Sequence, residues 1–174
     1  MKTFSALFGL SILMLITVYS ASTYAGSIIF RNKNNSMCTI DAPKVGAEPI
    51  QVNLTNSSNC KEPAIRSMEI VDLPSATQIL LTDSPTCSKT LTDTGSNWYW
   101  FELKTTRKKT SLGITEIEYL GTFSPPSMVG PGVQMTGKES IRPSYDMRDT
   151  LSCVRITTSK EPVSANPATS SPSK

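Results

Sequence analysis

The segment Asn97-Trp98-Tyr99-Trp100-Phe101-Glu102-Leu103-Lys104 gives the clearest indication of the fold class. Successive side chains of a β-strand point to opposite faces of a sheet, so Tyr99, Phe101 and Leu103 would share one face. That face is entirely apolar or aromatic, and we expect it to pack in a core. The opposite face would hold Trp98, Trp100, Glu102 and Lys104. The segment therefore predicts a strand with one buried face and one partly wet face.

Other segments of the chain share these features on a smaller scale. They are short, rich in apolar and β-branched residues, and bounded by turn residues. They cover 27–30, 50–54, 65–71, 77–81, 114–120, 133–135 and 151–156. No longer window shows the apolar period of about 3.6 residues that marks an amphipathic helix. Many short strands separated by turns predict an all-β sandwich or barrel.

The N-terminal region is typical of an export signal. Lys2 is followed by an apolar run over residues 6–18, and Thr23 and Ala25 occupy the small positions of a cleavage site. A membrane anchor is the alternative, but spanning a bilayer takes roughly 20 apolar residues, and this run is shorter. We expect a signal peptide over 1–25, a mature chain that begins near Gly26, and no later segment that spans a membrane. The protein would be secreted, or periplasmic in a Gram-negative bacterium.

Composition sets further limits on the mature chain. Residues 26–158 form the expected β-sandwich domain, and the Ser- and Pro-rich tail over 159–174 has too few apolar side chains to fold. The whole chain has 17 basic and 14 acidic side chains, and Lys2 is the only charge in the expected signal peptide. The mature net charge is then 16 − 14 = +2. Such a balance argues weakly against a nucleic-acid partner.

Four cysteines, Cys38, Cys60, Cys87 and Cys153, lie in the mature chain. An even number in an exported chain predicts two disulfides, and free buried thiols are the alternative. Metal binding is less favoured because no two cysteines have CxxC spacing and the chain contains no histidine. The sequence alone leaves all pairings of the four cysteines open.

The absence of histidine also limits catalysis. It excludes Ser-His-Asp and Cys-His sites, and no glycine-rich phosphate loop is present. Paired carboxylates, as in glycosidases, remain conceivable at Glu102, Glu116 and Glu118. Glu116 and Glu118 would share one face of a strand, and a solvated face is the simpler interpretation. We expect no enzymatic activity and no cofactor.

The most suggestive surface follows the aromatic segment. Lys104-Thr105-Thr106-Arg107-Lys108-Lys109 holds four cations in six residues and is expected to form the tip of a hairpin. Together with Trp98 and Trp100 these cations would form a binding surface for a protein, a glycan, or an envelope or membrane surface. The alternatives are that the two indoles pack in a core and that the four cations are simply solvated charges in a turn.

The two halves of the chain resemble each other. Ile28-Ile29-Phe30 is followed by a polar loop and Cys38, while Ile79-Leu80-Leu81 is followed by a polar loop and Cys87. Each half also ends with a short segment in which a serine precedes alternating apolar and charged residues. These two segments are 65–70 and 150–156. The second half is longer, with an apparent insertion around 104–146. The pattern indicates an internal duplication.

This pattern resembles the βγ-crystallin superfamily over about residues 27–158. Members have paired four-stranded Greek-key motifs that open with an apolar strand and close on a serine-containing strand. The resemblance implies a Greek-key sandwich, and with the duplication it implies disulfides Cys38–Cys60 and Cys87–Cys153. The hairpin glycine of the family is missing after Phe30.

The calcium motif of the superfamily is also incomplete. The family motif is two adjacent Asn or Asp residues, two variable residues, a Ser or Thr, and a final Ser. In the segment 148–153, Asp149 and Ser152 fit this motif. Arg148 stands where the first Asn or Asp is required, and Cys153 stands where the final Ser is required. In the first half, Glu62-Pro63-Ala64-Ile65-Arg66-Ser67 keeps only the final serine. We therefore expect weak calcium binding at most.

These observations favour a secreted, non-enzymatic binding protein that acts in defence, competition or host contact through a rigid β surface. An extracellular structural or matrix protein is the alternative, and a carboxylate-based hydrolase is a remote one. Three Asn-x-Ser/Thr sequons are present in the mature chain, and their use depends on the source. They begin at Asn34, Asn53 and Asn56.

Overall fold

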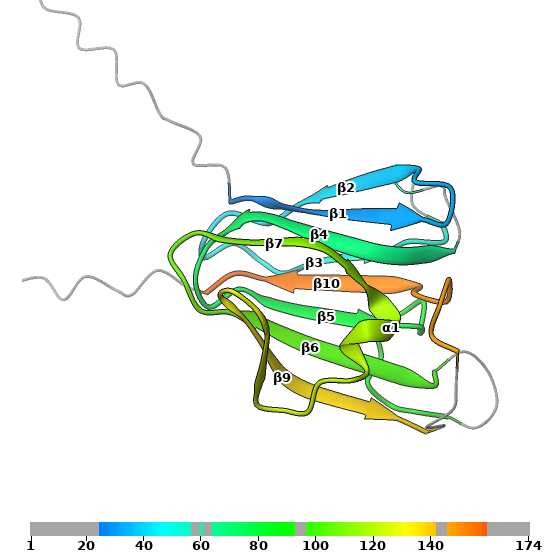
Figure 1. Ribbon diagram of the computed structural model, residues 1–174. Coiled ribbons are helices and arrows are strands. Elements are labelled where there is room, and N and C mark those ends of the chain that lie inside the picture. The colour runs from blue at the N-terminus through cyan, green and yellow to red at the C-terminus, as the bar shows by residue number, and fades with distance from the viewer. Residues whose placement is uncertain (1–24, 57–59, 61–63, 93–96, 142–145, 160–174) are drawn as a thin grey trace, which may run out of the picture.

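A computed structural model describes residues 25–56, 60, 64–92, 97–141 and 146–159 (Figure 1). The expected signal peptide, apart from Ala25, and the expected tail, apart from Ser159, lie outside the described residues. None of the helices in the described ranges has the length and apolarity needed to cross a membrane.

The strands form two antiparallel sheets that face each other (Figure 1). The four-stranded sheet has the order β2-β1-β4-β7, and the six-stranded sheet has the order β3-β10-β5-β6-β9-β8. Their bounds are β1 Ser27–Asn32, β2 Met37–Asp41, β3 Ile50–Asn53, β4 Ile65–Leu73, β5 Gln78–Thr82, β6 Tyr99–Thr105, β7 Thr110–Glu116, β8 Ser127–Gly130, β9 Val133–Ser140 and β10 Cys153–Thr157. The expected all-β sandwich is confirmed.

The core lies between the two sheets, and β6 shows how the sequence builds it. Tyr99, Phe101 and Leu103 are at most 1% exposed, as their alternation predicts. Burying an aromatic or leucine side chain of this size contributes roughly 1.5–3 kcal/mol. The intervening side chains of Trp100, Glu102 and Lys104 are only partly buried and form the outer face of the six-stranded sheet. The predicted division of this strand into two faces is therefore confirmed.

The two halves of the chain have the same strand pairing. Exchanging β1 with β5, β2 with β6, β3 with β7 and β4 with β10 converts the order β2-β1-β4-β7 into β6-β5-β10-β3. Each half thus forms three adjacent strands of its own sheet and sends one strand, β3 or β7, to the other sheet. The strands β8 and β9 fall outside this equivalence and extend the six-stranded sheet beyond β6. The extra segment starts after β7, so it is shorter than the insertion expected over 104–146.

Both disulfides have the expected partners. Cys38 is bonded to Cys60 with a Cα–Cα distance of 5.1 Å, and Cys87 is bonded to Cys153 with a Cα–Cα distance of 5.3 Å. The opening strand of each half pairs directly with its closing strand, β1 with β4 and β5 with β10. That proximity is what the duplication implied. Disulfides of this kind are typical of proteins that fold in an oxidising compartment.

The expected strand over 114–120 is wrong in its second half. β7 ends at Glu116, and a one-turn helix, α1, covers Ile117–Leu120 at one end of the sandwich (Figure 1). Ile117 and Leu120 are both fully buried, and positions three apart lie on one face of a helix. Tyr119, which a strand would place beside Ile117, is 54% exposed. The helical turn therefore buries Ile117 together with Leu120, whereas a strand would place Ile117 on the same face as Tyr119.

Two strands were not expected. β2 is an edge strand in which only Cys38 and Ile40 are buried, and β8 is an edge strand of four residues. Both are too short and too polar to show a strong alternating pattern. The expected hairpin tip over 104–109 is also wrong, because β6 and β7 belong to different sheets. Residues 106–109 instead form an arch that links the two sheets.

Candidate binding groove

The outer face of the six-stranded sheet carries a groove across β10, β5 and β6. A smaller hollow of about 150 Å³ is lined by Gln78, Leu80, Lys89, Glu102, Arg155 and Thr157. A larger hollow of about 500 Å³ lies between Lys104, residues 46–49 and residues 157–159. Gln78 and Thr157 line both hollows, so the two adjoin. We call this pair of adjoining hollows the sheet groove.

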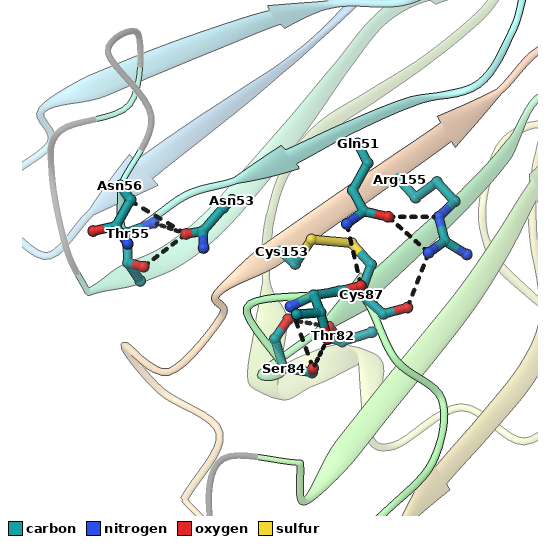
Figure 2. The surroundings of a disulfide bond; sticks show 10 residues. Gln51, Asn53, Thr55, Asn56, Thr82, Ser84, Cys87, Cys153 and Arg155 are labelled. Atoms are coloured by element: carbon teal, nitrogen blue, oxygen red, sulfur yellow. Dashed lines mark hydrogen bonds between the residues drawn. A yellow bond between two sulfur atoms is a disulfide. The ribbon is translucent and has the colours of Figure 1, made fainter.

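One wall of the sheet groove is the segment that follows β5. The Cys87–Cys153 disulfide ties this segment to β10, and Cys87 and Cys153 are at most 1% exposed (Figure 2). Gln51 of β3 donates from its amide Nε2 to the backbone oxygen of Thr86 at 3.1 Å. The wall is therefore held by a covalent bond and a side-chain hydrogen bond from a neighbouring strand.

Arg155 stands in this wall in a fixed orientation (Figure 2). Its Nε and Nη2 donate to Gln51 Oε1 at 3.1 and 2.7 Å, and Nη2 also donates to the backbone oxygen of Cys87 at 3.3 Å. Within the described residues no carboxylate lies within salt-bridge distance of the guanidinium, and Nη1 has no acceptor. Arg155 thus presents an uncompensated positive charge and a free donor beside the smaller hollow.

An ion pair also lines the smaller hollow. Lys89 Nζ lies 2.9 Å from Glu102 Oε1, and the two side chains are 43% and 27% exposed. The same ammonium lies 4.7 Å from the centre of the Trp100 ring, within the range of a cation–π contact. Glu102 Oε2 accepts no hydrogen bond from the described part of the chain. Glu102 is therefore held in place while one of its oxygens remains open to a ligand.

The indole of Trp100 packs closely against a glycine of the neighbouring strand, Gly137 of β9. A Cβ on Gly137 would come within 2.9 Å of Trp100 Cζ3, so only glycine allows the indole to lie this close to β9. The indole Nε1 donates to Glu139 Oε2 at 3.3 Å, and the ring packs against Leu80 and the Cys87–Cys153 disulfide. The indole therefore belongs to a small apolar cluster on the outer face, and Leu80 of this cluster lines the smaller hollow.

Trp98 lies outside the sheet groove, just before β6. Its backbone N–H donates to both oxygens of Asp83 at 3.0 and 2.9 Å, and the N–H of Tyr99 donates to the same carboxylate at 3.3 Å. Asp83 is only 3% exposed. Burial raises the pKa of this carboxyl, and the backbone hydrogen bonds oppose the rise. Asp83 fixes the start of β6 and hence the register that places Trp100 against Leu80 and the Cys87–Cys153 disulfide.

The basic residues of the predicted surface divide between two places. Lys104 lines the larger hollow and has no acidic partner in the described ranges. Arg107, Lys108 and Lys109 lie in the exposed arch after β6, where Lys109 Nζ is 2.8 Å from Asp72 Oδ2. The hydrogen bond from Lys109 lowers the pKa of Asp72. Since β6 rises about 3.3 Å per residue, the arch and Trp98 lie roughly 20 Å apart at opposite ends of the strand.

The remaining predicted carboxylates do not converge. Glu116 ends β7 and Glu118 lies in α1, so the two do not share a strand face. Asp149 of the expected calcium motif accepts both Nε and Nη2 of Arg66 at 3.2 and 2.7 Å. In the ranges that the structure describes, no three His, Cys, Asp or Glu side chains lie close enough to hold a metal ion.

The sequons lie at the end of the sandwich where β6 begins, and Asn53 is in register with Cys153, Thr82 and Trp100 across the six-stranded sheet. Asn34 and Asn56 are exposed, whereas Asn53 Oδ1 accepts from the backbone N–H groups of Thr55 and Asn56 and from the Thr55 hydroxyl (Figure 2). Asn53 is therefore partly engaged in a local turn.

Comparison with protein-family models, with curated proteins and with solved structures found no match to this chain. The sheet groove therefore has to be interpreted from its own geometry. Sequence reasoning found Glu102 and Lys104 of this groove, and Trp100 beside them, because they alternate along one strand. It missed Gln78, Lys89 and Arg155, which come from segments without any charged or aromatic cluster.

Proposed function

We propose that this chain is a secreted, non-enzymatic binding protein whose ligand lies in the sheet groove. The observation that carries the proposal is the pair of adjoining hollows across β10, β5 and β6, which share Gln78 and Thr157. Several polar groups along this path have unused hydrogen-bonding capacity within the described residues: the Gln78 amide, the Thr157 hydroxyl, Glu102 Oε2, Lys104 Nζ and Arg155 Nη1. Polar side chains with open donors and acceptors in a concave site are characteristic of ligand binding.

The rigidity of the site supports binding in preference to a purely structural role. Arg155, Lys89 and Glu102 are each held by other protein groups, and the Cys87–Cys153 disulfide anchors the wall. A preorganised site loses less conformational entropy when a ligand binds. A matrix protein would have no need to orient these groups toward an open hollow.

The test compares a groove variant with a matched surface variant. Mature protein is incubated with the insoluble extracellular polymers of its source, and the retained fraction is measured for wild type, Trp100→Ala/Lys104→Ala and Lys108→Ala. We expect the groove variant to lose retention and Lys108→Ala to keep it, because Lys108 is exposed in the arch outside the groove. Equal retention of all three proteins would favour the structural alternative. Thermal unfolding of each variant verifies that the fold is intact.

Export is the second part of this proposal. The apolar run over 6–18 and the small residues Thr23 and Ala25 support cleavage before Gly26. The disulfides support an oxidising destination. Intact-mass analysis of the exported protein is expected to give a chain that begins near Gly26, and a mass that includes residues 1–25 would contradict it.

We also propose that the fold arose by duplication and is a divergent relative of the βγ-crystallin superfamily. The equivalence of β1, β2, β3 and β4 with β5, β6, β7 and β10 supports this relationship. Both disulfides also join the hairpin region of a half to the segment that enters its closing strand. An experimental structure in which the two sets of strands fail to superpose in order would argue against it.

A further inference from the structure

We infer that the ligand of the sheet groove is a carboxylated oligosaccharide, a chain that contains uronic acid units. This inference rests on the proposed function and names the chemistry of its ligand. The net charge of the residues that line the two hollows is its first support. Three cations, Lys89, Lys104 and Arg155, and two carboxylates, Glu48 and Glu102, line the two hollows, so the groove carries a net charge of +1. Neither Arg155 nor Lys104 has a carboxylate partner in the described part of the chain.

The orientation of Arg155 specifies how a negative group would bind. Its Nε and Nη2 are occupied by Gln51 and the backbone of Cys87, while Nη1 is left for a ligand beside the smaller hollow. A charge-assisted hydrogen bond from a guanidinium to a carboxylate is about twice as strong as a neutral one. Because Arg155 is already oriented, little side-chain entropy is lost when this bond forms.

The polar lining indicates a ligand that also carries hydroxyl groups. Glu102 Oε2 requires a donor, Gln78 offers both a donor and an acceptor, and the Thr157 hydroxyl offers both as well. A hydroxyl group donates and accepts, so a row of sugar hydroxyls satisfies these groups together. The smaller hollow, at about 150 Å³, lies below the roughly 300–1,000 Å³ of a typical small-molecule pocket and suits a single ring.

The adjoining larger hollow indicates a chain of rings. It extends the groove to Lys104, the second unpaired cation, so an oligomer with a repeated negative charge places one carboxylate near each cation. Leu80 lines the smaller hollow and offers an apolar surface to the C–H face of a sugar ring, and Trp100 packs against Leu80. Lys89 lies over the indole and also lines this hollow.

An acidic peptide is the competing class, and the topology argues against it. Adding a strand to a free sheet edge is one of the recurring ways in which proteins bind extended peptides. The groove lies over β10, β5 and β6, and each of these strands is paired on both sides. Their backbone groups are therefore used within the sheet, and recognition has to come from side chains.

The experiment is calorimetric titration of the mature protein with three tetrasaccharides: one of galacturonic acid, its fully methyl-esterified form, and one of hyaluronan. We expect at least one acidic tetrasaccharide to bind and the ester to bind at least about tenfold more weakly, because it lacks the charge that Arg155 and Lys104 recognise. Rising salt is expected to weaken only the acidic ligand.

Variants separate the contributions of the groove residues. Arg155→Gln is expected to reduce the affinity for the acidic tetrasaccharide by at least about tenfold. Because Arg155 also supports the groove wall, Lys104→Gln provides a second variant that removes a cation without a protein partner. Lys108→Gln, outside the groove, is the matched control and is expected to bind as wild type does. Gly137→Ala displaces the indole without removing it, and is expected to weaken both the acidic and the esterified ligand.

Each outcome bears on a defined part of the inference. Equal binding of the acid and its ester would overturn the carboxylate requirement. Failure of both acidic tetrasaccharides to bind would overturn the sugar inference, and the proposed function would still stand if the groove variant loses retention on extracellular polymers. Stronger binding of a poly-glutamate peptide than of either acidic tetrasaccharide would replace the sugar with the peptide class.

Discussion

Replacing Asp83 by alanine tests how β6 is anchored. The carboxylate is almost fully buried and accepts hydrogen bonds from the backbone N–H groups of Trp98 and Tyr99. Alanine would leave both donors without an acceptor, and a buried unsatisfied donor costs about 1–3 kcal/mol. Water reaches the partly buried Trp98 N–H more easily than the buried Tyr99 N–H. We therefore expect the free energy of unfolding to fall by about 3 kcal/mol in total.

Urea unfolding followed by tryptophan fluorescence measures this change directly. The two tryptophans of the chain, Trp98 and Trp100, both lie close to the altered site. With a urea m-value of about 2 kcal/mol/M, the midpoint should fall by about 1.5 M. Asp146→Ala is the control, because Asp146 is exposed and its side chain bonds to Arg148 alone among the described residues. An unchanged midpoint for Asp83→Ala would mean that the carboxylate does not anchor β6.

The pH dependence of stability provides a second test of Asp83. Burial raises its pKa, so the folded state binds this proton more tightly than the unfolded chain. This contribution to stability is present below the unfolded pKa of about 3.9 and is lost as the pH rises through the raised value. Asp83→Asn cannot titrate. The stability difference between wild type and Asp83→Asn should therefore shift in favour of wild type as the pH falls, and a pH-independent difference would contradict the assigned cause.

Three further predictions follow from packing, loop closure and metal binding. Gly130→Ala should lower the free energy of unfolding by about 1–3 kcal/mol, because its Cβ would overlap the Leu112 side chain of β7 and force that side chain to repack. Gly113→Ala, with no atom within 4 Å of the added Cβ, should be tolerated, and urea midpoints compare the two variants. Replacing both cysteines of a disulfide by serine should lower the free energy of unfolding by about 4 kcal/mol for Cys87–Cys153 and by about 3 kcal/mol for Cys38–Cys60, because the disulfides close loops of 66 and 22 residues. The reverse order in urea unfolding would count against the chain-entropy account. Millimolar calcium should leave the melting temperature unchanged, because Asp149 already binds Arg66, and a clear rise would show a site that this ion pair does not block.

Much of the fold was predictable because alternation along a strand reflects burial directly. The pattern of Tyr99, Phe101 and Leu103 required one buried face, and the structure has it. The sequence similarity between the two halves also led to the correct disulfide pairing. The helical turn at Ile117–Leu120 was not predictable in the same way, since a four-residue helix has no periodicity to detect and its formation depends on what it packs against.

The candidate site was less predictable than the fold. Trp100, Glu102 and Lys104 are neighbours on one strand face, and the sequence could pair them. Arg155 joins them only because β10, the last strand of the domain, inserts between β3 and β5. Conversely, Arg107 and Lys108 are close to Lys104 in sequence, but the chain crosses to the other sheet after Thr105. Sequence proximity cannot reveal such a crossing, because it is determined by long-range strand pairing.

The central position of β10 has a consequence for the order of events during synthesis. Until Cys153–Thr157 has been made, β3 and β5 both have an open edge and the six-stranded sheet is incomplete. The nascent chain therefore cannot fold progressively from its N-terminus, and such long-range pairing makes folding slow. In an oxidising compartment Cys38 can meet Cys60 early, whereas Cys87 stays a reduced thiol, available to incorrect partners, until the final strand arrives.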